Sequence, residues 1–255
     1  MRIGFVGTGA ITEAMVTGIV GSGLEVAEIV ISPRNAEIAA RLASWFPAVR
    51  IAADNQEVLD AADVLLLAVR PQVAEEVITA LSFREGQTIV SVIAATDRSK
   101  LLTWIGEDVQ LTQAIPLPFV ADRQGVTAIF PPNAEIAAIF DALGSAVECE
   151  TKDEYDLLAV ASALMGTYFG ILDRAAGWLA EKGMAKAKAR AYLAPLFASL
   201  AQRAAKADQT ALDALRREFS TPGGLNEQVF EDFDRGGGSR ALTDALERVL
   251  ARVKG

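Results

Sequence analysis

Two glycines near the start of the chain lie where a phosphate group could bind. The apolar segment Arg2–Val6 is typical of a short buried strand, and the residues GTGAIT follow it directly, before a helical pattern over Ala10–Val20. In this order Gly7 permits a tight turn, Gly9 lets the backbone approach a pyrophosphate, and the helix N-terminus attracts its charge. Thr12 replaces the third glycine of the dinucleotide fingerprint. The expected contacts are Gly7, Thr8, Gly9, Ala10 and Ile11.

The end of the second expected strand indicates which dinucleotide binds. A site for NAD is expected to carry Asp or Glu there, whereas this chain reads ISPRN, with Ser32, Arg34 and Asn35. A guanidinium group binds a 2′-phosphate through two parallel hydrogen bonds. We therefore expect NADPH as the cofactor, with NADH less favoured. The alternative is that Ser32 caps a turn and Arg34 is merely solvated.

A second candidate site interrupts the Ala-rich helical region near the C-terminus. The stretch FSTPGGLNEQVF, Phe219–Phe230, contains Pro222, Gly223 and Gly224, which are unfavourable inside a helix. A helix that begins after them would expose the backbone N–H groups of residues 223–226, and such a terminus attracts anions. The structural alternative is a plain turn between two helices.

The composition excludes several kinds of chemistry. The 255 residues include no histidine and one cysteine, so His-based acid–base catalysis, Ser-His-Asp triads and zinc sites of His or several Cys are excluded. We expect no metal. A net charge of −9 without a basic stripe argues against nucleic acid. Cys149 cannot form an intramolecular disulfide, and we interpret it as a small buried hydrophobe.

The uninterrupted apolar runs of the sequence are too short to predict a membrane protein. Uninterrupted runs such as Val64–Val69 are far shorter than the roughly 20 residues of a membrane span. No apolar stretch of signal-peptide length precedes the first strand. We therefore expect a cytoplasmic protein that has no membrane partner.

Up to residue 150 the sequence alternates between strand and helix patterns. This alternation predicts an α/β fold, with a Rossmann-like, mostly parallel sheet covered by helices on both faces. The expected helices of this region include Ala10–Val20, Ala36–Ser44 and Val73–Leu81. The expected strands are Arg2–Val6, Glu28–Ser32, Asp63–Ala68, Thr88–Ile93, Gln110–Ala114, Val126–Phe130 and Ala146–Glu150.

After Thr151 only helical patterns remain. We therefore predict a dinucleotide-binding domain over residues 1–150 and a helical substrate and dimerisation domain over residues 151–255. About 100 residues of apolar, Ala-rich helix either pack within one subunit or interdigitate with a second copy as a homodimer or higher homo-oligomer. The expected helices are Asp153–Glu181, Ala185–Lys206, Ala211–Glu218, Leu225–Asp234 and Arg240–Lys254, with a flexible turn, RGGGSR, before the last.

Four segments together resemble a known family. RIGFVGTGAI, DNQEVLDAADVLLLAVRPQV, VSVIAA and STPGG occur in the order, and nearly at the spacing, found in pyrroline-5-carboxylate reductases. Those enzymes make proline by reducing a cyclic imine with NAD(P)H. The resemblance covers Arg2 to about Arg252. It implies a Rossmann N-terminal domain, a helical C-terminal domain that mediates dimerisation, and an active site between them.

The resemblance also implies further cofactor contacts. Asn55 would lie near the cofactor, and the loop Ala68, Val69, Arg70 and Pro71 would run along the dinucleotide. Ala94 and Ala95 would pass close to the nicotinamide. These positions agree with the rule that ligands of open α/β sheets bind beyond the carboxyl ends of the strands. The alternatives are that Asn55 caps its helix and that Arg70 pairs with a surface acid.

The resemblance also implies that the STPGG turn binds the carboxylate of the substrate. The implied substrate contacts are Thr221, Gly223, Gly224, Leu225 and Asn226, and the implied catalytic candidates are Tyr168, Thr221 and Asn226, through a hydrogen bond to the imine nitrogen. Imine reduction suits a chain without histidine, because a protonated iminium already carries the charge that attracts hydride.

Three departures from the family pattern affect the substrate half. Asn226 replaces a hydroxyl residue, and IPLP, Ile115–Pro118, replaces the family's MPN turn. Leu164 and Met165 replace small residues in SALMGTY, Ser162–Tyr168. The substrate is therefore expected to be 1-pyrroline-5-carboxylate or, with a rebuilt pocket, a different imine.

Two other functions compete with imine reduction. A β-hydroxyacid dehydrogenase is expected to carry a catalytic lysine at the start of its long helix, and Ser162–Arg174 contains none. A nucleotide-binding regulator without turnover would bind NADPH tightly and reduce no imine.

Overall fold

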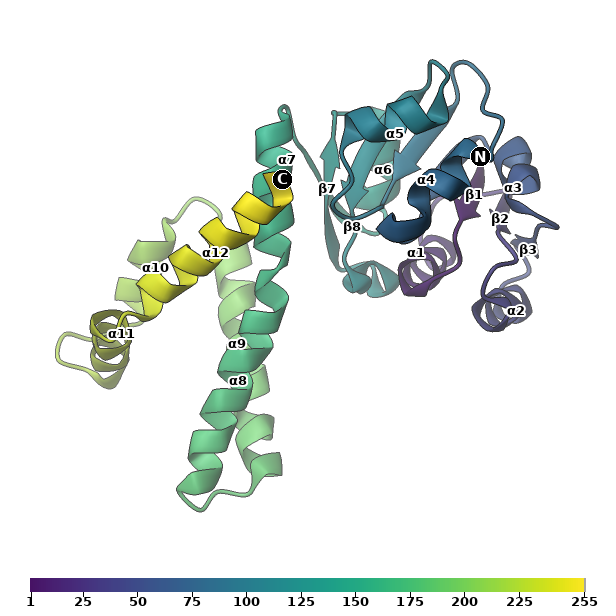
Figure 1. The fold of residues 1–255 in the computed structure, drawn as a ribbon. Helices are drawn as coiled ribbons and strands as arrows, with labels where there is room; N and C mark the ends of the chain where they lie inside the picture. The colour runs from purple at the N-terminus through teal and green to yellow at the C-terminus, as the bar shows by residue number, and fades with distance from the viewer. Residues whose placement is uncertain (255) are drawn as a thin grey trace. The chain divides into compact units, whose positions relative to one another are not determined.

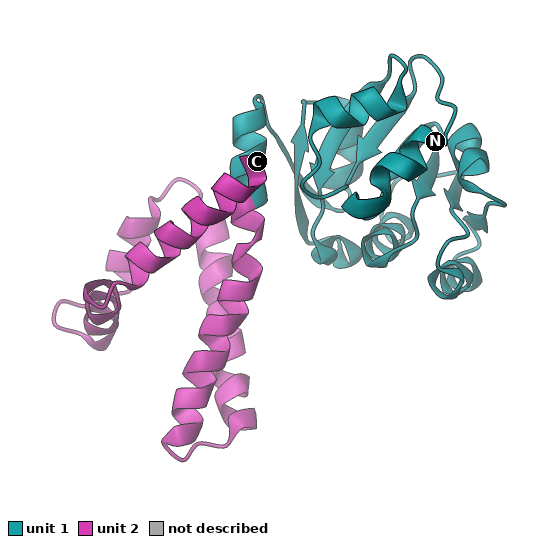
Figure 2. Cartoon of the chain, viewed as in Figure 1, with its two compact units in different colours: residues 1–159 teal, residues 160–255 magenta. Residues whose placement is uncertain are grey.

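The structure, a computed structural model, describes residues 1–254, which form two compact units. Residues 1–159 make up the first unit and residues from 160 onwards the second (Figure 2). The boundary falls inside helix α7 (Lys152–Ser162), whereas the boundary expected from the sequence lies where the strand patterns stop, after residue 150.

The first unit is built on an eight-stranded sheet in the order β3-β2-β1-β4-β5-β6-β7-β8. All neighbouring pairs are parallel except β6 and β7, which are antiparallel. The mostly parallel sheet expected from the alternating pattern is thus confirmed. The strands are β1 (Arg2–Val6), β2 (Glu28–Ile31), β3 (Val49–Ile51), β4 (Val64–Leu67), β5 (Thr88–Ser91), β6 (Gln110–Ile115), β7 (Gly125–Phe130) and β8 (Gly144–Glu148).

Helices cover both faces of this sheet (Figure 1). The helices are α1 (Ala10–Val20), α2 (Ala36–Trp45), α3 (Asn55–Ala61), α4 (Pro71–Thr79), α5 (Arg98–Ile105), the 3₁₀ helix η1 (Pro118–Asp122) and α6 (Ala134–Asp141). Phe5 contributes to the core beneath α1, α2 and α6, whereas its neighbour Val6 contributes to the core beneath α3, α4 and α5. Because both faces are buried, Val64–Leu67 is apolar throughout.

Several elements of the first unit were not expected. Strand β3 has only three residues, too few for a periodic pattern to be recognised. Helices α5 and α6 have only eight residues each, so their apolar patterns are short. A helix next to Asn55 was expected only as the one that Asn55 would cap, and α3 has seven residues there. Strand β8 begins and ends two residues earlier than expected.

The second unit is entirely helical, as expected. Its helices after α7 are α8 (Leu164–Glu181), α9 (Lys186–Lys206), α10 (Leu212–Glu218), α11 (Leu225–Arg235) and α12 (Gly238–Lys254). Among the described residues of this unit, the buried hydrophobic side chains are Val160, Ala189 and Leu215. Phe169 and Tyr192, by contrast, are 60% and 68% exposed. This unit therefore has little core of its own.

One helical stretch is apolar over an unusual length. By length and composition alone, Lys152–Glu181 would suffice to cross a membrane, and 17% of its apolar window is buried. Uninterrupted runs did not reveal this stretch, because polar residues such as Ser162 and Thr167 divide them. An exposed apolar surface of this kind is also typical of a protein–protein interface.

Candidate functional site

The glycine turn after β1 has the geometry of an anion cradle. Gly7 has φ +104°, and a Cβ there would lie 2.5 Å from the carbonyl oxygen of Ala68, so only glycine fits. Gly9 is the N-cap of α1, and no side chain caps this terminus. A Cβ on Gly9 would meet nothing within 4 Å. The open helix start therefore fits the pyrophosphate of a dinucleotide.

Buried hydroxyl groups hold the turn in this shape. Ser32 is fully buried, and its Oγ accepts a hydrogen bond from the Gly7 N–H at 3.0 Å. Thr8 Oγ1 donates to the Ser32 carbonyl at 2.6 Å. Thr12, in the place of the third glycine, donates from Oγ1 to the Gly7 carbonyl at 2.7 Å. Ser32 thus fixes the glycine turn. Thr12, where the fingerprint has a glycine, ties the first turn of α1 to the Gly7 carbonyl through its side chain.

Arg34 and Asn35, which follow Ser32 and Pro33, remain open to solvent. Arg34 is exposed, and within residues 1–254 no carboxylate forms an ion pair with it. Asn35 is the N-cap of α2 in a left-handed conformation, φ 68°, and its side chain makes no capping bond. Both side chains are therefore available to a phosphate at the end of β2.

The structure contradicts two of the alternatives considered above, namely that Asn55 caps its helix and that Arg70 pairs with a surface acid. Asp54, not Asn55, caps α3, and its carboxylate accepts from the Glu57 N–H at 2.8 Å. Arg70 is the exposed N-cap of α4, and no acid in the described part of the chain pairs with it. The Asn55 amide therefore does not cap a helix, and the Arg70 guanidinium forms no ion pair with another described residue.

The segment after β5 is also shaped by tertiary contacts. Ala94 and Ala95 are exposed, and Ala95 has a left-handed backbone, φ 50°. Gln113, which is buried on β6, donates from Nε2 to the carbonyl of Thr96 at 2.8 Å. Sequence reasoning missed Gln113, although a glutamine inside the apolar strand β6 was a visible signal.

The sheet topology brings the expected cofactor segments together. Strands β1, β4 and β5 are parallel neighbours, so the segments that follow them lie at one edge of the sheet. The chain order reverses between β1 and β4, which makes this edge the topological switch point where open α/β sheets bind ligands. The segments are Gly7–Ile11, Ala68–Pro71 and Ala94–Ala95, with Ser32, Arg34 and Asn35 following the adjacent β2.

Two carboxylates at helix starts near this edge are suited to structural roles. The pKa of Asp97 is lowered because the backbone N–H and the hydroxyl of Ser99 both donate to it. The pKa of Glu57 is lowered by the backbone N–H of Ala53 and by Arg50. Both carboxyl groups therefore stay ionised near neutral pH and are poor proton donors.

The expected substrate turn forms a helix start in the second unit. Helix α11 begins at Leu225 with Gly224 as its N-cap, and Gly223 has φ 70°. The Gly224 N–H donates to the Thr221 carbonyl at 2.7 Å, which closes the turn. Asn226 Nδ2 donates to the carbonyl of Phe219 at 2.7 Å. The helix break at Pro222 is therefore a helix N-terminus, as expected.

The expected substrate residues fall into two groups. Thr221, Gly223, Gly224, Leu225 and Asn226 lie together on the turn before α11. Tyr168 lies on α8, where its ring contacts Phe169 and Phe197 with centroids 5.2 and 6.0 Å apart. Within the described residues no hydrogen bond joins Tyr168 to the turn, and Tyr168 is 39% exposed.

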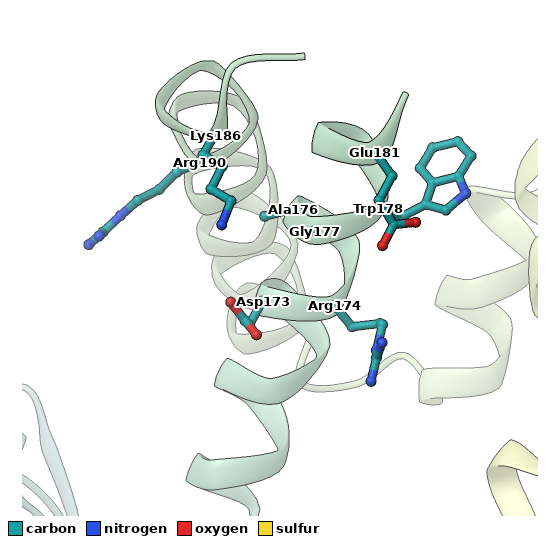
Figure 3. Close-up of a pocket in the computed structure, with 8 residues that line it drawn as sticks. All are labelled: Asp173, Arg174, Ala176, Gly177, Trp178, Glu181, Lys186 and Arg190. Atoms are coloured by element: carbon teal, nitrogen blue, oxygen red, sulfur yellow. The ribbon is translucent and has the colours of Figure 1, made fainter. Parts of the chain in front are cut away.

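A separate hollow of about 560 Å³ lies between α8 and α9. Its charged lining residues, drawn in Figure 3, are Asp173, Arg174, Glu181, Lys186 and Arg190. Figure 3 shows Trp178 and Arg190 directed to opposite sides of the helix pair. Three cations and two carboxylates nearly balance in charge, so this hollow selects no class of ligand. It contains none of the residues expected from the sequence.

Family models match both ends of the chain. Residues 2–95 match the model described as NADP oxidoreductase coenzyme F420-dependent. Residues 155–255 match the model described as pyrroline-5-carboxylate reductase dimerisation.

Individual proteins match over nearly the whole length. Pyrroline-5-carboxylate reductase of Pseudomonas aeruginosa is 27% identical over 262 residues, covering 98% of this chain and 95% of the relative. A Coxiella burnetii pyrroline-5-carboxylate reductase structure superposes with a TM-score of 0.87 at 21% identity, covering 99% and 97% of the two chains. A Plasmodium falciparum pyrroline carboxylate reductase structure with NADP bound gives 0.83 at 15% identity, covering 100% and 97%.

Proposed function

Because the chain belongs to the pyrroline-5-carboxylate reductase family, we propose that it is an NADPH-dependent reductase of a cyclic imine. The observation that carries this proposal is the uncapped helix start at Gly9, behind a turn that only glycine at position 7 can form. The substrate in the names of its relatives is 1-pyrroline-5-carboxylate, and reduction of that imine gives proline.

Arg34 supports NADPH over NADH in this proposal. An unpaired guanidinium group at the end of β2 offers two parallel hydrogen bonds to a 2′-phosphate. Asn55, Arg70 and the backbone near Ala94 and Ala95 would line the remainder of the dinucleotide. When bound, NADPH supplies a hydride with its two electrons to the imine carbon, and the C=N π pair moves to the protonated nitrogen, giving an amine and NADP⁺.

The chain itself then has to hold the imine in line with the hydride donor. Thr221, Asn226 and Tyr168 are the proposed hydrogen-bonding groups for the imine nitrogen. No side chain has to protonate a carbonyl oxygen during hydride transfer, because the iminium already carries its proton and charge. The absence of histidine from the 255 residues is compatible with this reaction.

We further propose that the second unit assembles with another copy of the chain, as a homodimer or larger oligomer in the cytoplasm. The matched dimerisation model begins at residue 155, inside α7, and so covers the whole of the second unit. Exposed aromatic side chains on α8, such as Phe169 and Trp178, would gain a core through this association.

The test is NADPH oxidation by the purified protein, followed at the nicotinamide absorbance with 1-pyrroline-5-carboxylate and, separately, with 1-pyrroline. NADH is measured in parallel, and we expect it to be the poorer donor. Turnover of at least one imine supports the proposal. NADPH binding without oxidation by either imine would overturn it in favour of a nucleotide-binding regulator.

A further inference from the structure

The turn before α11 is already occupied by a carboxylate of the chain itself. The Gly223 N–H donates to Glu227 Oε2 at 2.6 Å. Glu227 is the third residue of the helix, where a carboxylate is stabilised by the helix dipole. Glu227 therefore places a carboxylate of the chain itself at this helix start.

Two further donors of the turn are engaged as well. The Asn226 amide donates to the Phe219 carbonyl, and the Gly224 N–H donates to the Thr221 carbonyl, both at 2.7 Å. A substrate carboxylate placed here would have to displace Glu227 or lie beside its negative charge.

The arginines of the neighbouring segments form no ion pair with the Glu227 carboxylate. Arg203 pairs with Glu218 at 3.0 Å, and Arg217 pairs with Asp213 at 2.6 Å. The guanidinium of Arg216 stacks on the Phe230 ring, 4.4 Å from its centroid. Within residues 1–254 no lysine or arginine forms an ion pair with Glu227. The turn therefore carries a carboxylate that no ion pair in the described part of the chain neutralises.

From this arrangement we infer that Glu227 is a specificity-determining residue that excludes carboxylated imines and selects a cyclic imine without an acid group. The inference rests on the proposed imine reductase function and names its substrate class. A protonated imine without a carboxylate carries a single positive charge, which the Glu227 carboxylate attracts. A carboxylated imine brings a second negative charge to the same donors, where like charges repel.

The experiment measures kcat/KM with NADPH for 1-pyrroline and for 1-pyrroline-5-carboxylate, in the unmodified chain and in Glu227→Gln. Glutamine keeps an acceptor for the Gly223 N–H but removes the charge. We expect the unmodified chain to favour 1-pyrroline by about tenfold or more, and Glu227→Gln to shift the ratio of the two values about tenfold towards the carboxylated imine. Glu231→Gln, one turn further along the exposed face of α11, is the matched control and should leave the ratio unchanged.

The outcomes separate this inference from the proposed function. If the unmodified chain reduces neither imine, the reductase function itself fails. If it prefers 1-pyrroline-5-carboxylate, or if Glu227→Gln leaves the ratio unchanged, the inference about Glu227 is overturned and the function remains.

A second readout does not depend on how any variant folds. Pyrrolidine and proline, the two possible products, are compared as inhibitors of the unmodified enzyme. Stronger inhibition by pyrrolidine supports the inference, and stronger inhibition by proline contradicts it.

Discussion

The first unit buries its apolar residues on both sides of a sheet, whereas the second leaves many of them in contact with solvent. Strand β4 is buried along its whole length, and the helices on each side close two separate cores. On α8, none of the residues is fully buried, and Trp178 is 56% exposed. The difference teaches that the first unit is complete as a folded body, whereas the second leaves an apolar surface that the proposed association would cover.

Replacing Gly7 tests the self-sufficiency of the first unit and should have the largest effect. Gly7→Ala forces a side chain into a left-handed backbone and against the Ala68 carbonyl. We expect the free energy of unfolding to fall by about 3 kcal/mol, and NADPH binding to be lost. Urea unfolding and NADPH fluorescence titration measure the two effects.

Gly9→Ala is the matched control, because its Cβ would enter open space. Its loss of stability should stay below about 1 kcal/mol. Equal destabilisation by the two substitutions would contradict the role assigned to Gly7.

A charge on α8 tests whether the second unit needs a partner. In Phe169→Asp a carboxylate replaces an aromatic ring that is 60% exposed. We expect the dissociation constant of the oligomer to rise about a hundredfold, because buried aromatic residues dominate such interfaces. Sedimentation velocity measures the change. The control is Trp45→Asp, which alters a 57% exposed ring in the first unit and should leave the assembly intact. Dissociation in both variants, or in neither, would contradict the difference drawn between the two units.

Replacing Arg34 tests whether this residue sets the preference for NADPH over NADH. Arg34→Ala should weaken NADPH binding about tenfold and leave NADH binding nearly unchanged, because only NADPH carries the 2′-phosphate. Titration of the purified variant with each nucleotide gives the ratio. Arg84→Ala removes a surface arginine that is paired with Asp60 and should preserve the preference for NADPH. A parallel loss of both affinities would show that Arg34 does not read the phosphate.

The smallest expected effect is on the acid stability of the first unit. Arg2 holds the pKa of Asp63 below its ordinary value, chiefly by a side-chain hydrogen bond of 2.8 Å. A lowered folded-state pKa contributes stability above the ordinary carboxyl pKa of about 4, and this contribution is lost as the pH falls through the folded value. The effect is small, because both side chains are about half exposed.

Asp63→Asn should therefore reduce stability slightly at neutral pH and flatten its decline below about pH 4. Urea unfolding between pH 3 and pH 7 measures this, with Asp108→Asn as a control, because Asp108 is exposed and forms no ion pair among the described residues. An unchanged acid profile would contradict the role of the Arg2–Asp63 pair.

Local patterns were sufficient for much of the fold. Arg2–Val6 and Ala10–Val20 were predicted to the residue, because an apolar strand, a glycine turn and a helical stripe are all short-range signals. The three-residue strand β3 was missed, since its pairing with β2 rather than its own sequence defines it. The Glu227 cap was also missed, although a glutamate three residues after the N-cap Gly224 is a recognised signal.

The sequence by itself determined the alternation of strands and helices in the first unit, the glycine turn after β1 and the helix start after Pro222, because each depends on residues that are close neighbours in the chain. Only the tertiary structure decided that Ser32 holds the glycine turn and that Arg34 is unpaired. Residues 7 and 32 meet only through the pairing of β1 with β2. Whether a surface charge finds a partner likewise depends on which distant segments the fold places beside it.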